Sequence, residues 1–213
     1  PHNSGRRQRQ MCIRDRLGAD NIISTYKKFG FSKPINVNFP SATFGQINNR
    51  ENMSDIEIAN LGFGYGLDAS PFQIASAFSV FANEGIYKEF TLIMNDEYKY
   101  EEQVISKETA NKILFSLKDV VENGSGRKAK VLGFNIGGKT GTSHKSEKGG
   151  GYAKSIYTAS FAGIAPLESK DLTIFVSIYQ PGLNAYTGGD IAAPLFSEIA
   201  SDTLNYLGYF ESE

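Results

Sequence analysis

The residues best suited to chemistry lie in one short segment, Gly133-Phe-Asn-Ile-Gly-Gly-Lys-Thr-Gly-Thr-Ser143. Residues 133–140 match G-x-x-x-x-G-K-[ST], the pattern of a loop whose backbone amides and lysine bind nucleotide phosphates. Residues 139–141 also form a Lys-Thr-Gly triplet, which in some serine enzymes lies on a strand beside the acylating serine. The two interpretations require different secondary structure around the same residues.

A phosphate-binding loop requires a buried strand before Gly133 and a helix that begins at Lys139. The preceding residues, GRKAKVL, are short and basic. The following residues, GTSHKSEKGGG, begin and end with glycine, which disfavours a helix by about 1 kcal/mol per residue relative to alanine. The apolar run LTIFVSIY ends at Gln180, where an aspartate that holds magnesium is expected. The context therefore favours the strand interpretation.

On a strand, each residue type of this segment has a chemical task. Gly138 and Gly141 carry no side chain, so a peptide substrate can approach the backbone. The hydroxyls of Thr140 and Thr142 can donate hydrogen bonds to a substrate carboxylate. The Lys139 ammonium places positive charge beside that carboxylate and can assist proton movement at a nucleophile. The triplet alone still leaves open an ordinary hairpin strand with a surface lysine.

Other segments follow the order of motifs in one enzyme family. They are GFGYGLDASPFQIASAFSVFANEGIY (62–87), Gly124-Ser-Gly-Arg-Lys-Ala129, Tyr157-Thr-Ala-Ser-Phe-Ala-Gly-Ile-Ala-Pro166, and Tyr186-Thr-Gly-Gly189 followed by Ala193-Pro194. Together with Lys-Thr-Gly they resemble the transpeptidase domain of class B penicillin-binding proteins, specifically the cell-division peptidoglycan D,D-transpeptidases. The resemblance runs from about residue 17 to residue 207.

This resemblance implies an α+β fold of the serine β-lactamase and penicillin-binding-protein type, an antiparallel sheet flanked by helices, with the N-terminal part missing. It implies that a serine attacks a D-Ala-D-Ala stem peptide, releases the terminal D-Ala and passes the acyl group to a neighbouring stem's amine. It places Lys139 on the edge strand facing the cleft as a catalytic residue, with Tyr186 at the cleft mouth. The other substrate-binding residues that it implies are Gly138, Thr140, Gly141 and Thr142.

The same family needs two further motifs, Ser-x-x-Lys with the nucleophile and Ser-x-Asn. Ser24-Thr-Tyr-Lys27 fits the first pattern, but in a chain with 20 serines and 15 lysines one or two such matches arise by chance. A second match, Ser125 to Lys128, falls in a turn, and Ser-x-Asn does not occur. In the resemblance, the residues around Ser24 correspond to a helix that follows Ser-x-Asn. We therefore expect the nucleophile upstream of residue 17 and this fragment alone to be inactive.

Other functions remain open at this point. A D,D-carboxypeptidase or a β-lactamase-like hydrolase uses water as the acyl acceptor, and a non-catalytic module keeps the fold without the chemistry. His144 follows the motif and has the chemistry of a general base. We interpret it as a loop histidine, because the family's chemistry uses lysine and serine.

Apolar spacing predicts the elements that must position these residues. The expected helices are 19–29, a short stretch from 54 to 61, 71–83, 107–122 and about 190–206. The expected strands, rich in β-branched and aromatic residues, are 133–143, 155–165 and 171–180. The short connections between them favour antiparallel hairpins over crossovers.

The first 16 residues differ in composition from the rest. They contain five arginines and one acidic residue, whereas the remaining chain has 17 basic and 22 acidic residues. One interpretation is a basic arm that binds phosphates. We favour a tail foreign to the domain, since it lacks apolar periodicity and MCIRDR resembles translated adapter sequence. The expected organisation is a non-domain tail, 1–16, and the C-terminal portion of a transpeptidase domain, 17–213.

Composition limits the function classes. The net charge of −1 argues against a strongly basic nucleic-acid binder, and a single cysteine allows no intrachain disulfide and no cysteine-based zinc site. We expect no metal and no cofactor. By resemblance, the partners are the stem peptide, β-lactams as inhibitors and membrane proteins of the divisome. The resemblance also implies the periplasmic face of the bacterial inner membrane, with an N-terminal anchor helix outside this fragment.

Overall fold

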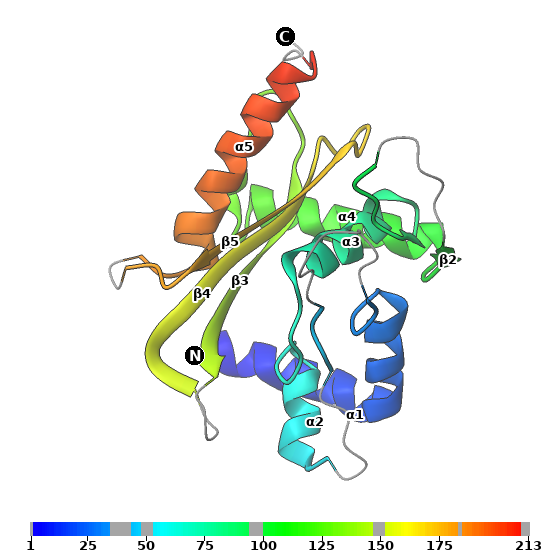
Figure 1. Cartoon of the computed structure of the whole chain (residues 1–213). Helices are drawn as coiled ribbons and strands as arrows, with labels where there is room; N and C mark the ends of the chain where they lie inside the picture. Colours follow the sequence, from blue (N-terminus) through cyan, green and yellow to red (C-terminus); the bar gives the residue numbers. More distant parts are fainter. Residues whose placement is uncertain are drawn as a thin grey trace. The chain divides into compact units, whose positions relative to one another are not determined.

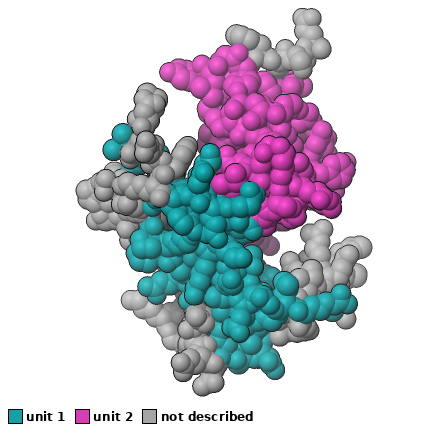
Figure 2. Space-filling model, turned by 90° about the vertical axis from the view of Figure 1, so that its right-hand side faces the viewer, with its two compact units in different colours: residues 1–77, 87–104 teal, residues 78–86, 105–213 magenta. Residues whose placement is uncertain are grey.

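The computed structural model describes residues 2–34, 44–47, 53–93, 100–146, 152–182 and 185–209. The chain forms two compact units, which Figure 2 colours separately. Unit 1 consists of residues 1–77 and 87–104, and unit 2 consists of residues 78–86 and 105–213. None of the helices in these described ranges is long and apolar enough to cross a membrane.

Unit 1 begins with helix α1 (His2–Lys28), which Gly18 interrupts with a φ of 75°. After this break the helix buries Ile22 and Ile23 against Leu61, the last residue of helix α2 (Asp55–Leu61). This part confirms the helix predicted from residue 19. The helical backbone of residues 2–17 was not predicted, because periodicity is weak there, although arginine and glutamine favour helices intrinsically.

Helix α3 (Pro71–Ala82) starts at a reciprocal cap. The Ser70 hydroxyl accepts from the Gln73 amide, and the Gln73 side chain accepts from the Ser70 amide, at 3.2 and 3.0 Å. Gln73 is only 3% exposed and also accepts from the Gly45 amide at 2.9 Å. This buried amide therefore fixes both the helix start and a neighbouring loop. A two-stranded sheet of β1 (Ile86–Lys88) and β2 (Glu101–Gln103) was missed because each strand has only three residues.

The sheet of unit 2 contains β3 (Gly137–Ser146), β4 (Tyr152–Ala165) and β5 (Leu172–Tyr179), in that order and all antiparallel. The three strands and their hairpin connections confirm the prediction. The first strand starts four residues later than expected, because Gly133 has a φ of 78° in the turn closed by a bridge between Val131 and Phe134.

This sheet also rules out the phosphate-binding loop. Lys139 and Thr140 lie within β3, where they pair with Ala162 and Phe161 of β4. A phosphate-binding loop needs the same two residues at the start of a helix. The G-x-x-x-x-G-K-[ST] match is therefore a coincidence of sequence.

Helices cover both faces of the sheet. Adjacent residues on a strand point to opposite faces, and a Cβ at Gly137 would meet Leu117 of helix α4 (Lys107–Glu122), whereas Gly138 lies against the Phe161 ring. Phe161 packs on Phe196 of helix α5 (Ala193–Tyr206), with ring centroids 4.7 Å apart. Figure 1 shows α5 running alongside β4 and β5. The core of unit 2 thus lies between the sheet and α5.

We expect Phe196→Ala to lower the free energy of unfolding of unit 2 by about 3–5 kcal/mol, because it leaves a cavity under Phe161. Phe196 is fully buried, whereas Phe115 on α4 is 77% exposed. Phe115→Ala is therefore the matched control and should change the stability by less than about 0.5 kcal/mol. Thermal unfolding followed by circular dichroism tests the pair, and equal midpoints for the two variants would contradict this core.

Candidate active site at the edge of the sheet

Three segments of unit 2 form the candidate site, and the central one is strand β3, which lies at one edge of the described three-stranded sheet. The first is the turn after α4, which leads into the short 3-10 helix η1 (Arg127–Ala129). The second is β3 itself, with the Lys-Thr-Gly triplet. The third is the segment before α5, which includes the π-helical turn η2 (Gly188–Ala192). Such turns often occur at functional sites.

The Lys139 side chain bends toward its neighbour on the strand. Its Nζ donates to the Thr140 carbonyl oxygen at 2.8 Å and lies 3.4 Å from the Thr140 hydroxyl. Lys139 and Thr140 start from opposite faces of the sheet. Their polar groups meet because β3 is an edge strand in the described sheet, so a long side chain can reach past it. The structure therefore brings the predicted ammonium and one predicted hydroxyl together.

The hydroxyls of the two threonines connect β3 to the flanking segments. The Thr140 Oγ1 lies 2.8 Å from the Ser125 Oγ in the turn after α4. The Thr142 Oγ1 accepts from the Gly188 amide at 3.0 Å. Accepting that bond leaves the Thr142 hydroxyl hydrogen as a donor. The Thr142 hydroxyl is thus held by a backbone amide, and the Thr140 hydroxyl by the Ser125 hydroxyl at 2.8 Å and, at 3.4 Å, by the Lys139 ammonium.

Glycines allow this close approach. A Cβ at Gly188 would overlap the carbonyl oxygens of Gly141 and Ser160, and it would lie 3.0 Å from the Gly141 nitrogen. A Cβ at Gly138 would enter the Phe161 ring, and one at Gly141 would meet the Ser160 hydroxyl. Gly138 is therefore required by packing against a ring and the β4 backbone, whereas a side chain at Gly141 would displace only the Ser160 hydroxyl. Their role in substrate approach stays a prediction.

An exposed ion pair connects the turn after α4 to the segment before α5. Lys128 Nζ lies 2.9 Å from Asp190 Oδ1, and the Thr187 hydroxyl donates to Asp190 Oδ2 at 2.6 Å. Thr187 also accepts from the Asp190 amide at 3.2 Å, which caps η2. The Thr187 hydrogen bond and then the Lys128 ammonium hold the pKa of Asp190 below its usual value.

The predicted cleft-mouth residue, Tyr186, is 38% exposed and stacks on Tyr157 with ring centroids 4.4 Å apart. Tyr157 in turn packs on His144 at 4.6 Å. The three rings form a row across β3, β4 and the segment before η2. The interpretation of His144 as a loop residue was wrong, because β3 continues through residue 146. The strand was predicted to end at residue 143, because the glycines at 149–151 indicate a loop.

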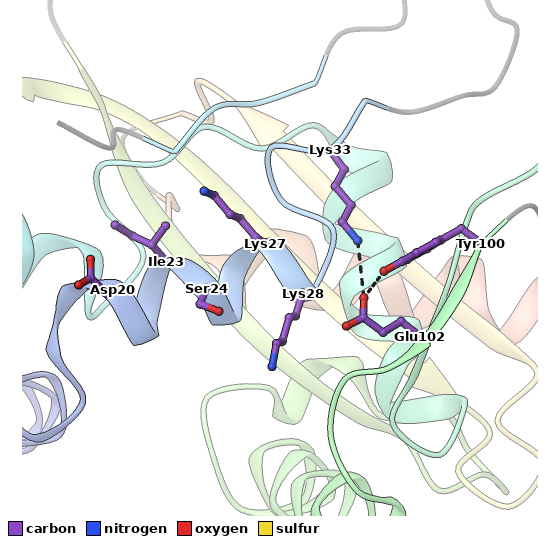
Figure 3. A pocket seen from close by; sticks show the side chains of 8 residues that line it. All are labelled: Asp20, Ile23, Ser24, Lys27, Lys28, Lys33, Tyr100 and Glu102. Atoms are coloured by element: carbon purple, nitrogen blue, oxygen red, sulfur yellow. Dashed lines mark hydrogen bonds and ion pairs between the residues drawn. The ribbon is translucent and has the colours of Figure 1, made fainter. Parts of the chain in front are cut away.

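The other Ser-x-x-Lys match, Ser24 to Lys27, lies on α1 in unit 1. Both residues line an open depression of about 500 Å³ together with Asp20, Ile23, Lys28, Lys33, Tyr100 and Glu102 (Figure 3). No hydrogen bond joins Ser24 to Lys27, and in Figure 3 the Lys27 side chain extends away from Ser24. The charge contacts among these lining residues lie away from Ser24: Lys33 lies 4.0 Å from Glu102 and over the Tyr100 ring, and the Tyr100 hydroxyl donates to Glu102. The depression therefore shows no activated serine.

Sequence reasoning missed the residues that support the triplet: Ser125, Lys128, Thr187, Gly188 and Asp190. The motif segments 124–129 and 186–189 already contained four of them, and Asp190 directly follows the second segment. Nothing in the sequence indicates that these two segments contact each other, because that contact depends on the tertiary fold. Within the described residues, no group of three or more His, Cys, Asp or Glu side chains could hold a metal ion.

A family model described as the penicillin binding protein transpeptidase domain matches residues 10–201. The chain belongs to this transpeptidase family. It is 33% identical to the probable peptidoglycan D,D-transpeptidase PbpC of Pseudomonas aeruginosa, over 90% of this chain and 34% of the relative. It is 32% identical to the peptidoglycan D,D-transpeptidase FtsI of Buchnera aphidicola, over 86% of this chain and 32% of the relative. The chain spans about a third of the length of these relatives.

Solved structures agree with the family. The transpeptidase domain of penicillin-binding protein 3 from Burkholderia pseudomallei superposes with a TM-score of 0.86 at 32% identity, covering 96% of this chain and 62% of that one. Penicillin-binding protein 3 from Mycobacterium tuberculosis, complexed with ampicillin, gives a TM-score of 0.85 at 25% identity, covering 95% of this chain and 49% of that one. The fold predicted for the transpeptidase is thereby confirmed.

The ion pair between Lys128 and Asp190 gives a pH prediction. Because the folded state lowers the pKa of Asp190, its contribution to stability is present above the unfolded pKa of about 3.9 and is lost as the pH falls through the folded value. Thr187→Val and Lys128→Met should each raise the pKa of Asp190, and the double variant should restore its ordinary value. Carboxyl carbon NMR against pH measures this, and an unchanged titration in both variants would contradict the contacts.

Proposed function

We propose that residues 17–213 are the C-terminal portion of a peptidoglycan D,D-transpeptidase domain, and that residues 1–16 are a tail outside it. The break in α1 at Gly18 supports a boundary there, whereas the match to the family model begins at residue 10, inside the proposed tail. The main support for the activity is the edge of β3, where an ammonium and two hydroxyls are held beside one another. The relatives named as D,D-transpeptidases support the same reaction.

In this proposal the β3 edge forms one wall of the cleft. The hydroxyls of Thr140 and Thr142 donate to the terminal carboxylate of a D-Ala-D-Ala stem peptide, and Lys139 supplies the positive charge beside it. Gly138 and Gly141 complete the wall, and Tyr186 lines its mouth. The strand therefore orients the peptide so that its penultimate carbonyl faces a serine from another part of the domain.

The chemical step needs that serine. Its oxygen attacks the carbonyl carbon of the penultimate D-Ala, the bond to the terminal D-Ala nitrogen breaks, and the released amine takes a proton. The amine of a neighbouring stem then attacks the acyl ester and regenerates the serine. We propose that the nucleophile lies outside residues 17–213, because the chain contains no Ser-x-Asn and its Ser24 match is unsupported.

The same proposal covers location and partners. We propose that the complete protein acts on the periplasmic face of the bacterial inner membrane, anchored by an N-terminal helix, and meets divisome membrane proteins. The ground for this assignment is the resemblance of the motif segments to the cell-division D,D-transpeptidases. β-Lactams would acylate the same serine, in keeping with the ampicillin complex of the Mycobacterium tuberculosis relative.

The 213-residue chain alone should form no covalent adduct with fluorescent penicillin, whereas the complete protein should take up one label per molecule. The reason is that the chain contains no Ser-x-Asn to accompany its two Ser-x-x-Lys matches, at Ser24 and Ser125, so the proposal places the nucleophile outside this chain. Gel fluorescence and peptide mass spectrometry measure the labelling. A label on Ser24 would show that the proposed location of the nucleophile is wrong.

In the complete protein, Lys139→Ala should lower the acylation rate constant by about 10²- to 10⁴-fold, since it removes the charge beside the carboxylate and the aid to proton movement. Lys145 lies on the same strand and donates to the Tyr179 hydroxyl at 2.6 Å. Lys145→Ala is the matched control and should acylate at the rate of the unmodified protein. Stopped-flow kinetics with a chromogenic β-lactam provide the measurement, and equal rates in both variants would refute the role of Lys139.

A further inference from the structure

The hydrogen-bond partners of the Thr140 hydroxyl point to a residue with no assigned role. Only two groups approach Thr140 Oγ1 among the described residues: the Lys139 Nζ at 3.4 Å and the Ser125 Oγ at 2.8 Å. An ammonium has hydrogens to donate and no lone pair to accept with. Lys139 can therefore only add a hydrogen to Thr140, whereas Ser125 can either donate or accept.

This difference matters when a carboxylate binds. With the site empty, Thr140 can give its own hydrogen to Ser125. A carboxylate has no hydrogen to offer, so Thr140 must turn its hydrogen toward it. Ser125 must then reverse its role and donate to Thr140. Two hydroxyls can exchange direction in this way, and a chain of such bonds strengthens each member.

The turn that carries Ser125 is held rigidly enough for this task. The Gly124 and Gly126 amides both donate to the Val120 carbonyl, at 3.1 and 3.0 Å. A Cβ at Gly189 would meet the Ser125 carbonyl oxygen and lie 3.7 Å from the Thr140 methyl group. The turn is therefore packed between the end of α4 and η2. Ser125 Oγ has no other hydrogen-bond partner in the described part of the chain, so its hydrogen is available to Thr140.

We propose that Ser125 is a positioning residue that orients the Thr140 hydroxyl toward the free carboxylate of the substrate or of a β-lactam. This inference rests on the proposed function, because it assumes that Thr140 binds the carboxylate. A charged acceptor gains about twice as much from an oriented donor as a neutral one does. Ser125 should therefore increase the preference for a free carboxylate over an ester of the same compound.

The test compares benzylpenicillin with its methyl ester in the complete protein. The measured quantity is the ratio of the second-order acylation rate constants for the two compounds. Ser125→Ala should reduce this ratio by about five- to tenfold, the effect of one hydrogen bond to a neutral group. Ser125→Thr, which keeps the hydroxyl, should restore the ratio. A purely structural role would lower both rate constants equally and leave the ratio unchanged.

Ser116→Ala is the matched control, since Ser116 lies on the exposed side of α4 and bonds only to the Lys112 carbonyl. It should keep the ratio of the unmodified protein. An unchanged ratio in Ser125→Ala would overturn the inference while leaving the proposed function intact. Failure of the unmodified complete protein to react with either compound would instead overturn the proposed function itself. An unmodified protein that reacts without preferring the carboxylate would overturn the inference.

Discussion

Strand β3 pairs with a single neighbour, β4, in the described sheet, and the candidate site depends on this one constraint. Side chains on a strand alternate between two faces, so Lys139 and Thr140 leave in opposite directions. At a free edge a long side chain can reach past the backbone, which brings the ammonium to the threonine carbonyl and hydroxyl. In the interior of a sheet a neighbouring strand would occupy that space.

The edge remains useful only because its surroundings are rigid. Phe161 and Phe196 fix the sheet against α5, and Gly188 approaches the β3 and β4 backbones more closely than any side chain would permit. The hydroxyls of Thr140 and Thr142 each bond to a different flanking segment. Glycines and hydroxyls thus hold β3 against its flanking segments, and in the proposed function this arrangement leaves the Lys139 ammonium beside the substrate carboxylate.

The elements that carry this site were largely predictable. Apolar spacing predicted helices α2, α3 and α4, and in the structure they start directly after Ser54, Ser70 and Ser106, whose hydroxyls accept backbone amide hydrogens of the first turn. The β-branched and aromatic runs predicted β3, β4 and β5 within a few residues. Strands β1 and β2 were not predicted, because three residues are too few to show an alternating apolar pattern. The π-helical turn η2 was not distinguished from the predicted helix 190–206, because its N-terminal cap resembles that of an α-helix.

The sequence by itself determined the family and predicted the residues proposed for the β3 wall, because several ordered motifs over most of the chain are far more specific than Lys-Thr-Gly alone. The letters of the motif fit both a phosphate loop and a strand, the surrounding sequence favoured the strand, and the pairing of Lys139 with Ala162 confirms it. Tertiary structure alone also brought Ser125 to Thr140 and Lys128 to Asp190. Local propensity acts over a few neighbours, whereas these contacts join residues 15 and 62 positions apart, which only the closed fold brings together.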